Sequence, residues 1–291
     1  MNRSIKAFSL IELSIVILVI GVLIAGVSQG GKMITKFKIT TAASLTNSSP
    51  VHSIKNLVAW YETTSEKSFI ATESDDGQSV STWYDINTQQ LKKRNATSSG
   101  TSKPTYKISG DTGLPMLYFD GSNDYFNLPN STLTSGNSSF TTFVVDIRQD
   151  KSGFVTLYSS GTWYFTPPQI NMLRYSFQHL YNFLGGSANT NYVLSPSINS
   201  WGKSINMATY NNDITNRIVE IYRSGIGLRS VAANFTLNIG TTHNYIGSTY
   251  LAPRETYKGY IGELIIFDRY LKTEERESVK AYLSQKWGIK I

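Results

Sequence analysis

The stretch that decides the fold covers residues 257–289, YKGYIGELIIFDRYLKTEERESVKAYLSQKWGI. Residues 259–268 are apolar and rich in isoleucine and aromatic side chains, which predicts a strand. A helix is predicted to follow, with Thr273 as its N-cap and with Glu274 and Glu275 favourable to the helix dipole. Gly288 stands where a helix C-terminus belongs. One apolar stripe at helical spacing favours packing against a sheet over a partner site: Val279, Tyr282, Leu283 and Trp287.

Short strand-like runs continue upstream of this stretch, back to residue 58. Turn sequences such as FDGSND, RSGIG and LGGSAN separate them, and no helical pattern lies between them. Many short strands without intervening helices predict an antiparallel sandwich or jelly roll. The predicted strands are residues 58–62, 79–86, 115–120, 140–147, 153–159, 217–223 and 244–248.

This part of the chain resembles the laminin-G-like, concanavalin A-like jelly-roll domains of bacterial surface proteins. The resemblance rests on the stretch already quoted and on NLVAWYE, VSTWYD, LPMLYFDGSNDYFNLP, VEIYRSG and YIGS, and it extends over residues 56–289. It implies a mainly β protein whose residues 51–291 form one jelly-roll domain with a C-terminal helix. Lectins, calcium-dependent binding modules, glycosidases and structural spacers share that fold, so the fold does not settle the function.

Charge and cysteine content exclude several classes of function. The formal net charge is +7, but residues 1–55 hold six basic residues and one acid, whereas residues 56–291 hold 21 basic and 19 acidic residues. The excess therefore surrounds the N-terminal apolar segment, which favours membrane topology over nucleic-acid binding. Cysteine is absent, which excludes disulfides, thiolate metal sites and cysteine nucleophiles.

The N-terminal segment predicts a transmembrane helix. Residues 13–31 carry no charge, and as a helix they would span roughly 28 Å, close to the thickness of the hydrocarbon core. We divide this region into a leader (residues 1–7), a transmembrane helix (8–31) and a helical extension with a linker (32–50). Arg3 and Lys6 favour a cytoplasmic N-terminus, although the lysines after the helix argue weakly the other way. A secretory signal cleaved near Ser28 is the alternative.

The start of this segment resembles the type IV prepilin signal. A short basic leader ends at the small residue Ala7, Phe8 follows, and Glu12 is the fifth residue counted from Phe8. The resemblance implies that prepilin peptidase cleaves between Ala7 and Phe8 and that the new amino terminus of Phe8 is methylated. The family usually has glycine before the cut, so Ala7 departs from its pattern.

Glu12 is an ionisable residue inside an apolar segment, and such residues are expected to have a function. The resemblance implies that its carboxylate pairs with the amino terminus of a neighbouring subunit during assembly. The alternative is that Glu12 lies at the membrane interface, solvated by headgroups. The implied partners are the peptidase, other pilin or pseudopilin subunits and the inner membrane. The implied locations are the inner membrane for the precursor and a pilus or periplasmic pseudopilus afterwards.

Two sets of residues in the jelly-roll region are candidate ligand sites. Asp120, Asn123 and Asp124 could supply oxygen ligands to calcium, although a hairpin turn that uses the same side chains is the favoured alternative. Trp163, Tyr175 and Trp201 could stack on sugar rings, with burial in the core as the alternative for each. Both assignments are hypotheses about a ligand-binding head.

The sequence favours a binding protein over an enzyme. No Glu-x-Asp-x-Glu pattern occurs, and the three histidines lie far apart in the sequence. We therefore expect a pilin-like or pseudopilin subunit that displays its head for adhesion or glycan binding. A membrane-tethered glycan-active enzyme and a structural spacer without a ligand are the alternatives.

Overall fold

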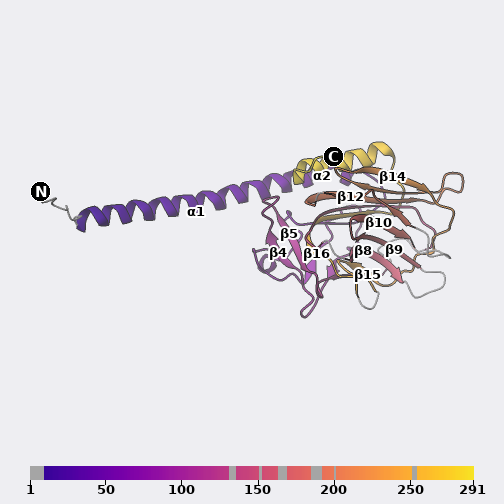
Figure 1. Cartoon of the computed structure of the whole chain (residues 1–291), viewed down its shortest axis with the longest axis horizontal. Helices are drawn as coiled ribbons and strands as arrows, with labels where there is room; N and C mark the ends of the chain where they lie inside the picture. Colours follow the sequence, from indigo (N-terminus) through magenta and orange to yellow (C-terminus); the bar gives the residue numbers. More distant parts are fainter. Residues whose placement is uncertain are drawn as a thin grey trace, which may run out of the picture.

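A long helix and a β-sandwich head make up the chain (Figure 1). The computed structural model describes residues 10–130, 136–150, 153–162, 169–184, 192–199, 201–250 and 254–291. Helix α1 (Leu10–Asn47) projects away from the head over most of its length. It runs without interruption through Gly30 and Gly31, so the predicted extension and the apolar segment form one helix.

The first sheet, sheet A, has eight strands, and all its pairings are antiparallel. Its strands lie in the order β14-β13-β12-β7-β16-β5-β4, and β1 pairs with β16. The bounds are β1 (Leu57–Glu62), β4 (Thr105–Ile108), β5 (Pro115–Asp120), β7 (Phe140–Arg148), β12 (Lys203–Asn211), β13 (Ile218–Arg223), β14 (Gly227–Ala232) and β16 (Lys258–Phe267).

The second sheet, sheet B, also has eight antiparallel strands, in the order β11-β10-β9-β8-β15-β6-β3-β2. The bounds are β2 (Thr82–Trp83), β3 (Ala96–Thr97), β6 (Phe126–Leu128), β8 (Phe154–Thr162), β9 (Gln169–Ser176), β10 (His179–Leu184), β11 (Tyr192–Leu194) and β15 (Asn244–Ile246). Short 3-10 helices occur at η1 (Pro50–His52) and η2 (Ala71–Glu73). The predicted antiparallel sandwich is therefore confirmed.

Both faces of the central strands of sheet A are buried, which makes the head three layers deep there. Alternate residues of β16 point to opposite faces: Leu264 and Ile266 belong to the core between the sheets, whereas Ile265 and Phe267 belong to the core under the helices. The helical layer consists of α2 (Thr273–Trp287) and the last turns of α1, from which Ala42 is buried against the sheet. Side chains on both faces explain why β16 reads as an unbroken apolar run.

Helix α2 follows β16 as the sequence predicts, with one correction at its start. Lys272, not Thr273, occupies the N-cap position, and the Glu275 carboxylate accepts the backbone N–H of Lys272 at 2.9 Å. The carboxylate of Glu275, a residue of the helix itself, thus pairs with a backbone N–H group at the helix N-terminus. Gly288 has φ 60° and ψ 43°, the left-handed conformation expected of a glycine that ends a helix.

Candidate functional site

The N-terminal half of α1 is an exposed apolar surface. Its large apolar side chains between Leu10 and Val27 are 46–85% exposed. Within the described residues, α1 is the one helix that is long and apolar enough to cross a membrane. Glu12 lies in its first turn. Ala7, Phe8 and the predicted cleavage position between them lie outside the described residues.

Two glutamates face one another beneath the helical layer. Glu62 at the end of β1 is the direct register partner of Glu263 on β16. Like charges directly opposite each other in a sheet are destabilising unless a cation lies between them. Both side chains are completely buried, so water cannot screen the repulsion. This pair therefore requires a buried cation.

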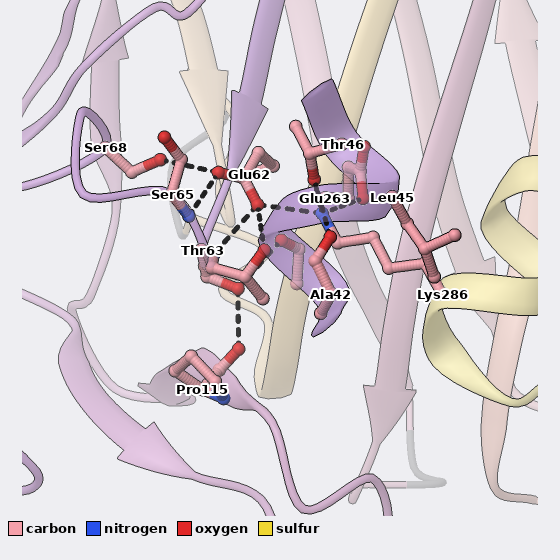
Figure 2. Close-up of polar contacts among 12 residues, drawn as sticks. Ala42, Leu45, Thr46, Glu62, Thr63, Ser65, Ser68, Pro115, Glu263 and Lys286 are labelled. Atoms are coloured by element: carbon pink, nitrogen blue, oxygen red, sulfur yellow. Dashed lines mark hydrogen bonds and ion pairs between the residues drawn. The ribbon is translucent and has the colours of Figure 1, made fainter. Parts of the chain in front are cut away.

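Lys286 of α2 supplies that cation (Figure 2). Its ammonium lies 2.7 Å from Oε2 of Glu62 and 2.9 Å from Oε2 of Glu263, and its side chain is also completely buried. It donates a third hydrogen bond, of 2.8 Å, to the Thr46 hydroxyl in the last turn of α1. One lysine therefore connects both helices to two neighbouring strands.

Uncharged hydrogen-bond donors stabilise the two carboxylates of this cluster further. Glu62 accepts hydrogen bonds from the backbone N–H groups of Thr64 and Ser65 and from the hydroxyls of Thr64 and Ser68. Glu263 accepts the indole N–H groups of two tryptophans and a tyrosine hydroxyl, at distances of 2.8–2.9 Å, from Trp60, Trp287 and Tyr282. Hydrogen bonds to a carboxylate favour its charged form, and those from Thr64 help to lower the pKa of Glu62. We call Thr46, Glu62, Glu263, Tyr282 and Lys286 the junction cluster.

The pKa shifts in the junction cluster agree with an ionised pair. Burial alone would raise the pKa of Glu62, but the charge and hydrogen bond of Lys286 and the donors of Thr64 lower it overall. Burial alone would lower the pKa of Lys286, and the two glutamates raise it overall. Attraction between these groups therefore exceeds the desolvation of each.

A cavity of about 460 Å³ lies at a different place in the head, beside the β13–β14 hairpin. Its rim is polar and rich in glycine, and its lining includes the cations Lys203, Arg223 and Lys290 but no acidic side chain. Trp201 contributes a half-buried aromatic ring. We call this space the Trp201 cavity; it is lined by Ser197, Ile198, Asn199, Trp201, Gly202, Lys203, Arg223, Ser224, Gly225, Ile226, Gly288, Ile289 and Lys290.

Two arginines lie against the indole of Trp201. The guanidinium carbons of Arg148 and Arg223 are 4.7 Å and 5.6 Å from the centre of its ring. Arg223 is anchored by Nη1, which donates to the Tyr175 hydroxyl, to Ser204 and to Asn206 at 2.5–3.0 Å. Cations close to an aromatic face are attracted to its π-electrons.

A buried carboxylate holds the inner side of this arrangement. Asp146 of β7 accepts hydrogen bonds from four side chains and lies 4.0 Å from Nη1 of Arg223. The donors, at 2.6–3.0 Å, are Tyr175, Ser204, Asn206 and Tyr257. Burial, followed by the charge of Asp146, raises the pKa of Tyr257 well above its ordinary value, so its hydroxyl remains a donor. The carboxylate is thus fully engaged by the protein itself.

The three aromatic residues predicted to bind sugars differ in where they lie. Trp201 lines the cavity. Tyr175 is completely buried between the sheets, so its ring cannot stack on a ligand; that prediction is wrong, because its hydroxyl is needed as a donor to Asp146. Trp163 lies outside the described residues.

The predicted calcium ligands form a turn. Asp120 accepts the backbone N–H groups of Ser122 and Asn123, and Asp124 accepts the backbone N–H of Asp120. Gly121 adopts φ 83°, as the turn requires. Among the residues that the structure describes, no group of three or more histidine, cysteine or acidic side chains could hold a metal ion. The geometry favours the turn that the sequence offered as the alternative.

Sequence reasoning missed both buried polar clusters. Glu62 and Glu263 are 201 positions apart and become neighbours only through the β1–β16 pairing. One signal was present: Glu263 interrupts an otherwise apolar strand, and Lys286 interrupts the apolar side of α2. A charged residue inside an apolar run indicates a buried partner of opposite charge.

Comparison with known proteins shows a shared fold. No protein-family model matches the chain, and no curated protein matches its sequence. The binding domain of Paraclostridial Mosquitocidal Protein 1 is similar in structure, with a TM-score of 0.53 and 14% identity over 82% of this chain and 56% of that one. Trypanosoma rangeli sialidase has a TM-score of 0.50 and 18% identity over 80% of this chain and 33% of that one.

A CBM40 module of the Ruminococcus gnavus IT-sialidase, solved with α2,3-sialyllactose, is also similar, with a TM-score of 0.42 and 12% identity. It covers 50% of this chain and 82% of its own. The similarities to the mosquitocidal-protein domain and to the Trypanosoma rangeli sialidase, at 14% and 18% identity, describe the arrangement of strands.

The sialidase comparison corrects one prediction. The sequence favoured a protein that is not an enzyme, because no paired-carboxylate motif was found. The fold of this chain nevertheless occurs within the chain of a sialidase. The absence of that motif therefore does not exclude catalysis, and the prediction is withdrawn.

Proposed function

We propose that this protein is a pilin-like or pseudopilin subunit whose β-sandwich head binds glycans. The observation that carries the proposal is the division of α1. Its first half exposes apolar side chains along its length, whereas its last turn is hydrogen-bonded into the head by Lys286. A helix of this kind can lie in a membrane, and later in a filament, while it holds a folded domain outside.

Glu12 supports an assembly role for the exposed half of α1. A carboxylate near the start of such a helix costs free energy in lipid, roughly 2.5–3.5 kcal/mol at the bilayer centre and less towards the surface. Pairing with the amino terminus of a neighbouring subunit recovers part of this cost. The precursor would then lie in the inner membrane with a periplasmic head, and prepilin peptidase would release Phe8 as the new terminus.

Mass spectrometry of the protein from a host that contains prepilin peptidase tests this proposal. The expected mature chain begins at N-methylated Phe8, and Ala7→Gly keeps or improves its yield. Glu12→Ala is expected to leave cleavage largely intact and to impair co-assembly with a major pilin. Glu73→Ala, in the head, is the matched control for loss of a carboxylate. An intact Met1, or cleavage near Ser28, would overturn the proposal.

The Trp201 cavity supports the glycan-binding part. It combines an aromatic ring with polar rim residues and backbone groups, the combination with which proteins hold sugar rings. The expected result on a glycan array is binding by the full chain in detergent, reduced at least about tenfold by Trp201→Ala. Binding that Trp201→Ala leaves unchanged would remove this cavity from the proposal and leave the anchor unaffected.

A further inference from the structure

We propose that the Trp201 cavity selects acidic sugars, specifically sugars that carry a carboxylate. This inference rests on the proposed glycan-binding function and names its ligand class. Three cations line the cavity: Lys203, Arg223 and Lys290. Because the lining contains no acidic side chain, an anionic group of a ligand would meet only positive charge there.

The arginines have unused hydrogen-bonding capacity. Arg148 is 3% exposed, yet its Nε and Nη2 atoms are buried with no hydrogen-bond acceptor in the described part of the chain; only Nη1 is paired, to the Phe177 carbonyl at 2.7 Å. Within the described ranges, the hydrogen bonds found for Arg223 also come from Nη1. Leaving buried guanidinium donors unpaired costs free energy, so this arrangement is suited to an added acceptor.

The carboxylate already present does not fulfil this role. Asp146 is engaged by four donors and approaches Nη1 of Arg223, the nitrogen that is already bonded. Burial lowers the pKa of Arg148 overall, although the charges of Asp146 and Asp150 act in the opposite direction. Three cations line the cavity and Arg148 lies beside Trp201, so positive groups there outnumber these two carboxylates.

The geometry favours a carboxylate on a sugar ring over a small free anion. Trp201 and Arg223 both line the cavity, and the guanidinium groups of Arg148 and Arg223 lie close to the indole ring. A sugar ring can stack on the indole while a planar carboxylate on that ring pairs with a guanidinium fork. Glycines at the rim, Gly225 and Gly288, allow a ligand to approach the backbone.

Binding of the full chain in detergent to paired oligosaccharides tests this inference. Uronate and sialate oligosaccharides are immobilised beside their carboxyl-reduced forms and beside sulfated neutral sugars. We expect the carboxylated forms to bind at least about tenfold more tightly than the reduced forms. Equal affinity for both forms, or a preference for the sulfated sugars, would overturn the acidic-sugar inference and leave glycan binding standing. No binding to any sugar would overturn both.

Variants separate recognition from stability. Lys290→Gln, at the exposed rim, should weaken carboxylate binding about two- to fivefold, and added salt should reduce the difference. Arg229→Gln, an exposed arginine on β14 outside the cavity lining, is the matched control and should change binding less than twofold. Arg148→Met should weaken carboxylate binding; its melting temperature is measured as well, because the change removes two unpaired buried donors and also the hydrogen bond from Nη1 to Phe177. Carboxylate binding that survives Arg148→Met and Lys290→Gln together would overturn the inference.

Discussion

Lys286 is the residue on which the connection between the helices and the sheet depends. It neutralises two carboxylates that the register of β1 and β16 places opposite each other. A buried ion pair adds little net stability compared with apolar residues of the same shape, but removal of one partner is costly. The pattern therefore predicts a strong effect from the lysine and a milder one from coordinated replacement of all three charges.

Lys286→Met should destabilise the full chain by about 3–5 kcal/mol, because it leaves two buried carboxylates without a cation. Urea unfolding in detergent, followed by tryptophan fluorescence, measures this change. Lys55→Met, at an exposed lysine, is the matched control and should stay within about 0.5 kcal/mol of the parent. Addition of Glu62→Gln and Glu263→Gln to Lys286→Met should recover part of the loss. A single variant as stable as the control would contradict the charge argument.

The same residues predict how stability depends on pH. The pKa of Glu62 is lowered in the folded state, so its contribution is present above the ordinary value of about 4.3 and is lost as the pH falls through the lower folded pKa. The pKa of Lys286 is raised, so its contribution is complete below about 10.4 and is lost as the pH rises through the higher folded pKa.

Urea midpoints measured across pH test the acid side of this prediction. Glu62→Gln removes the titrating group, so the variant should lose less stability than the parent between about pH 5 and pH 2. Parallel profiles for the two proteins would show that Glu62 does not contribute.

At the residue scale, the sequence indicates which kinds of side chain could contact a ligand better than it indicates which individual residues do so. Trp201 was proposed as a ligand-binding aromatic because it lies where the sequence is least like a regular sandwich, and the structure places it in the lining of a cavity. Tyr175 looked equivalent in sequence, yet it is buried, since Asp146 on a distant strand needs its hydroxyl. Such pairings depend on strand register and leave no local pattern in the sequence.

At the scale of elements, β16 and α2 fit together through one glycine. A Cβ atom at Gly262 would lie 2.5 Å from the indole of Trp287 and 2.9 Å from the side chain of Met116. Gly262 therefore allows α2 to lie directly on sheet A. This explains why a glycine is tolerated in the middle of a long, otherwise apolar strand.

Gly262→Ala should accordingly destabilise the head by about 1–3 kcal/mol through overpacking. Thermal unfolding followed by circular dichroism is the measurement. Gly110→Ala is the matched control, because a Cβ atom there meets nothing within 4 Å, and its melting temperature should stay close to that of the parent. Equal melting temperatures for the two variants would mean that α2 can shift to accommodate the methyl group.

Strands with a continuous apolar run were predictable from the sequence, and strands whose apolar run is interrupted were not. Strands β1, β5, β7 and β16 were predicted within two residues of their bounds, because apolar side chains follow one another along each. Residues 79–86 were predicted as one strand, but only Thr82–Trp83 forms β2, since the rest of that run makes irregular contacts. Strands β9, β10 and β12 escaped prediction because buried polar residues interrupt their apolar patterns, among them Arg174, Asn182 and Asn206.

At the scale of the whole molecule, α1 has two parts with different environments. Its contacts with the head come from the last turns and include Ile39, Ala42 and Thr46. Its earlier residues contribute exposed apolar surface. The membrane-facing and head-facing functions of the helix can therefore be separated by truncation.

Removal of residues 1–31 should leave a head that is monomeric without detergent and melts within a few degrees of the full chain. Removal of residues 1–47 should lower the melting temperature by roughly 4–8 °C or more, because it also removes Ala42 and Thr46. Light scattering and thermal unfolding measure both properties. Aggregation of the shorter deletion, or equal melting of the two, would contradict this division of α1.

The junction cluster also determines where a mechanical load enters the head. A pull on α1 reaches Lys286 through Thr46 and passes to Glu62 on β1 and Glu263 on β16. Strand β16 pairs with β1, β5 and β7, so the tension that Glu263 carries arrives in the interior of sheet A, whereas Glu62 lies on β1, whose one partner among the described strands is β16. A strand paired on one side can be peeled away one hydrogen bond at a time, so the contact between Lys286 and Glu263 lets the interior strand β16 share a load that would otherwise act on β1 alone.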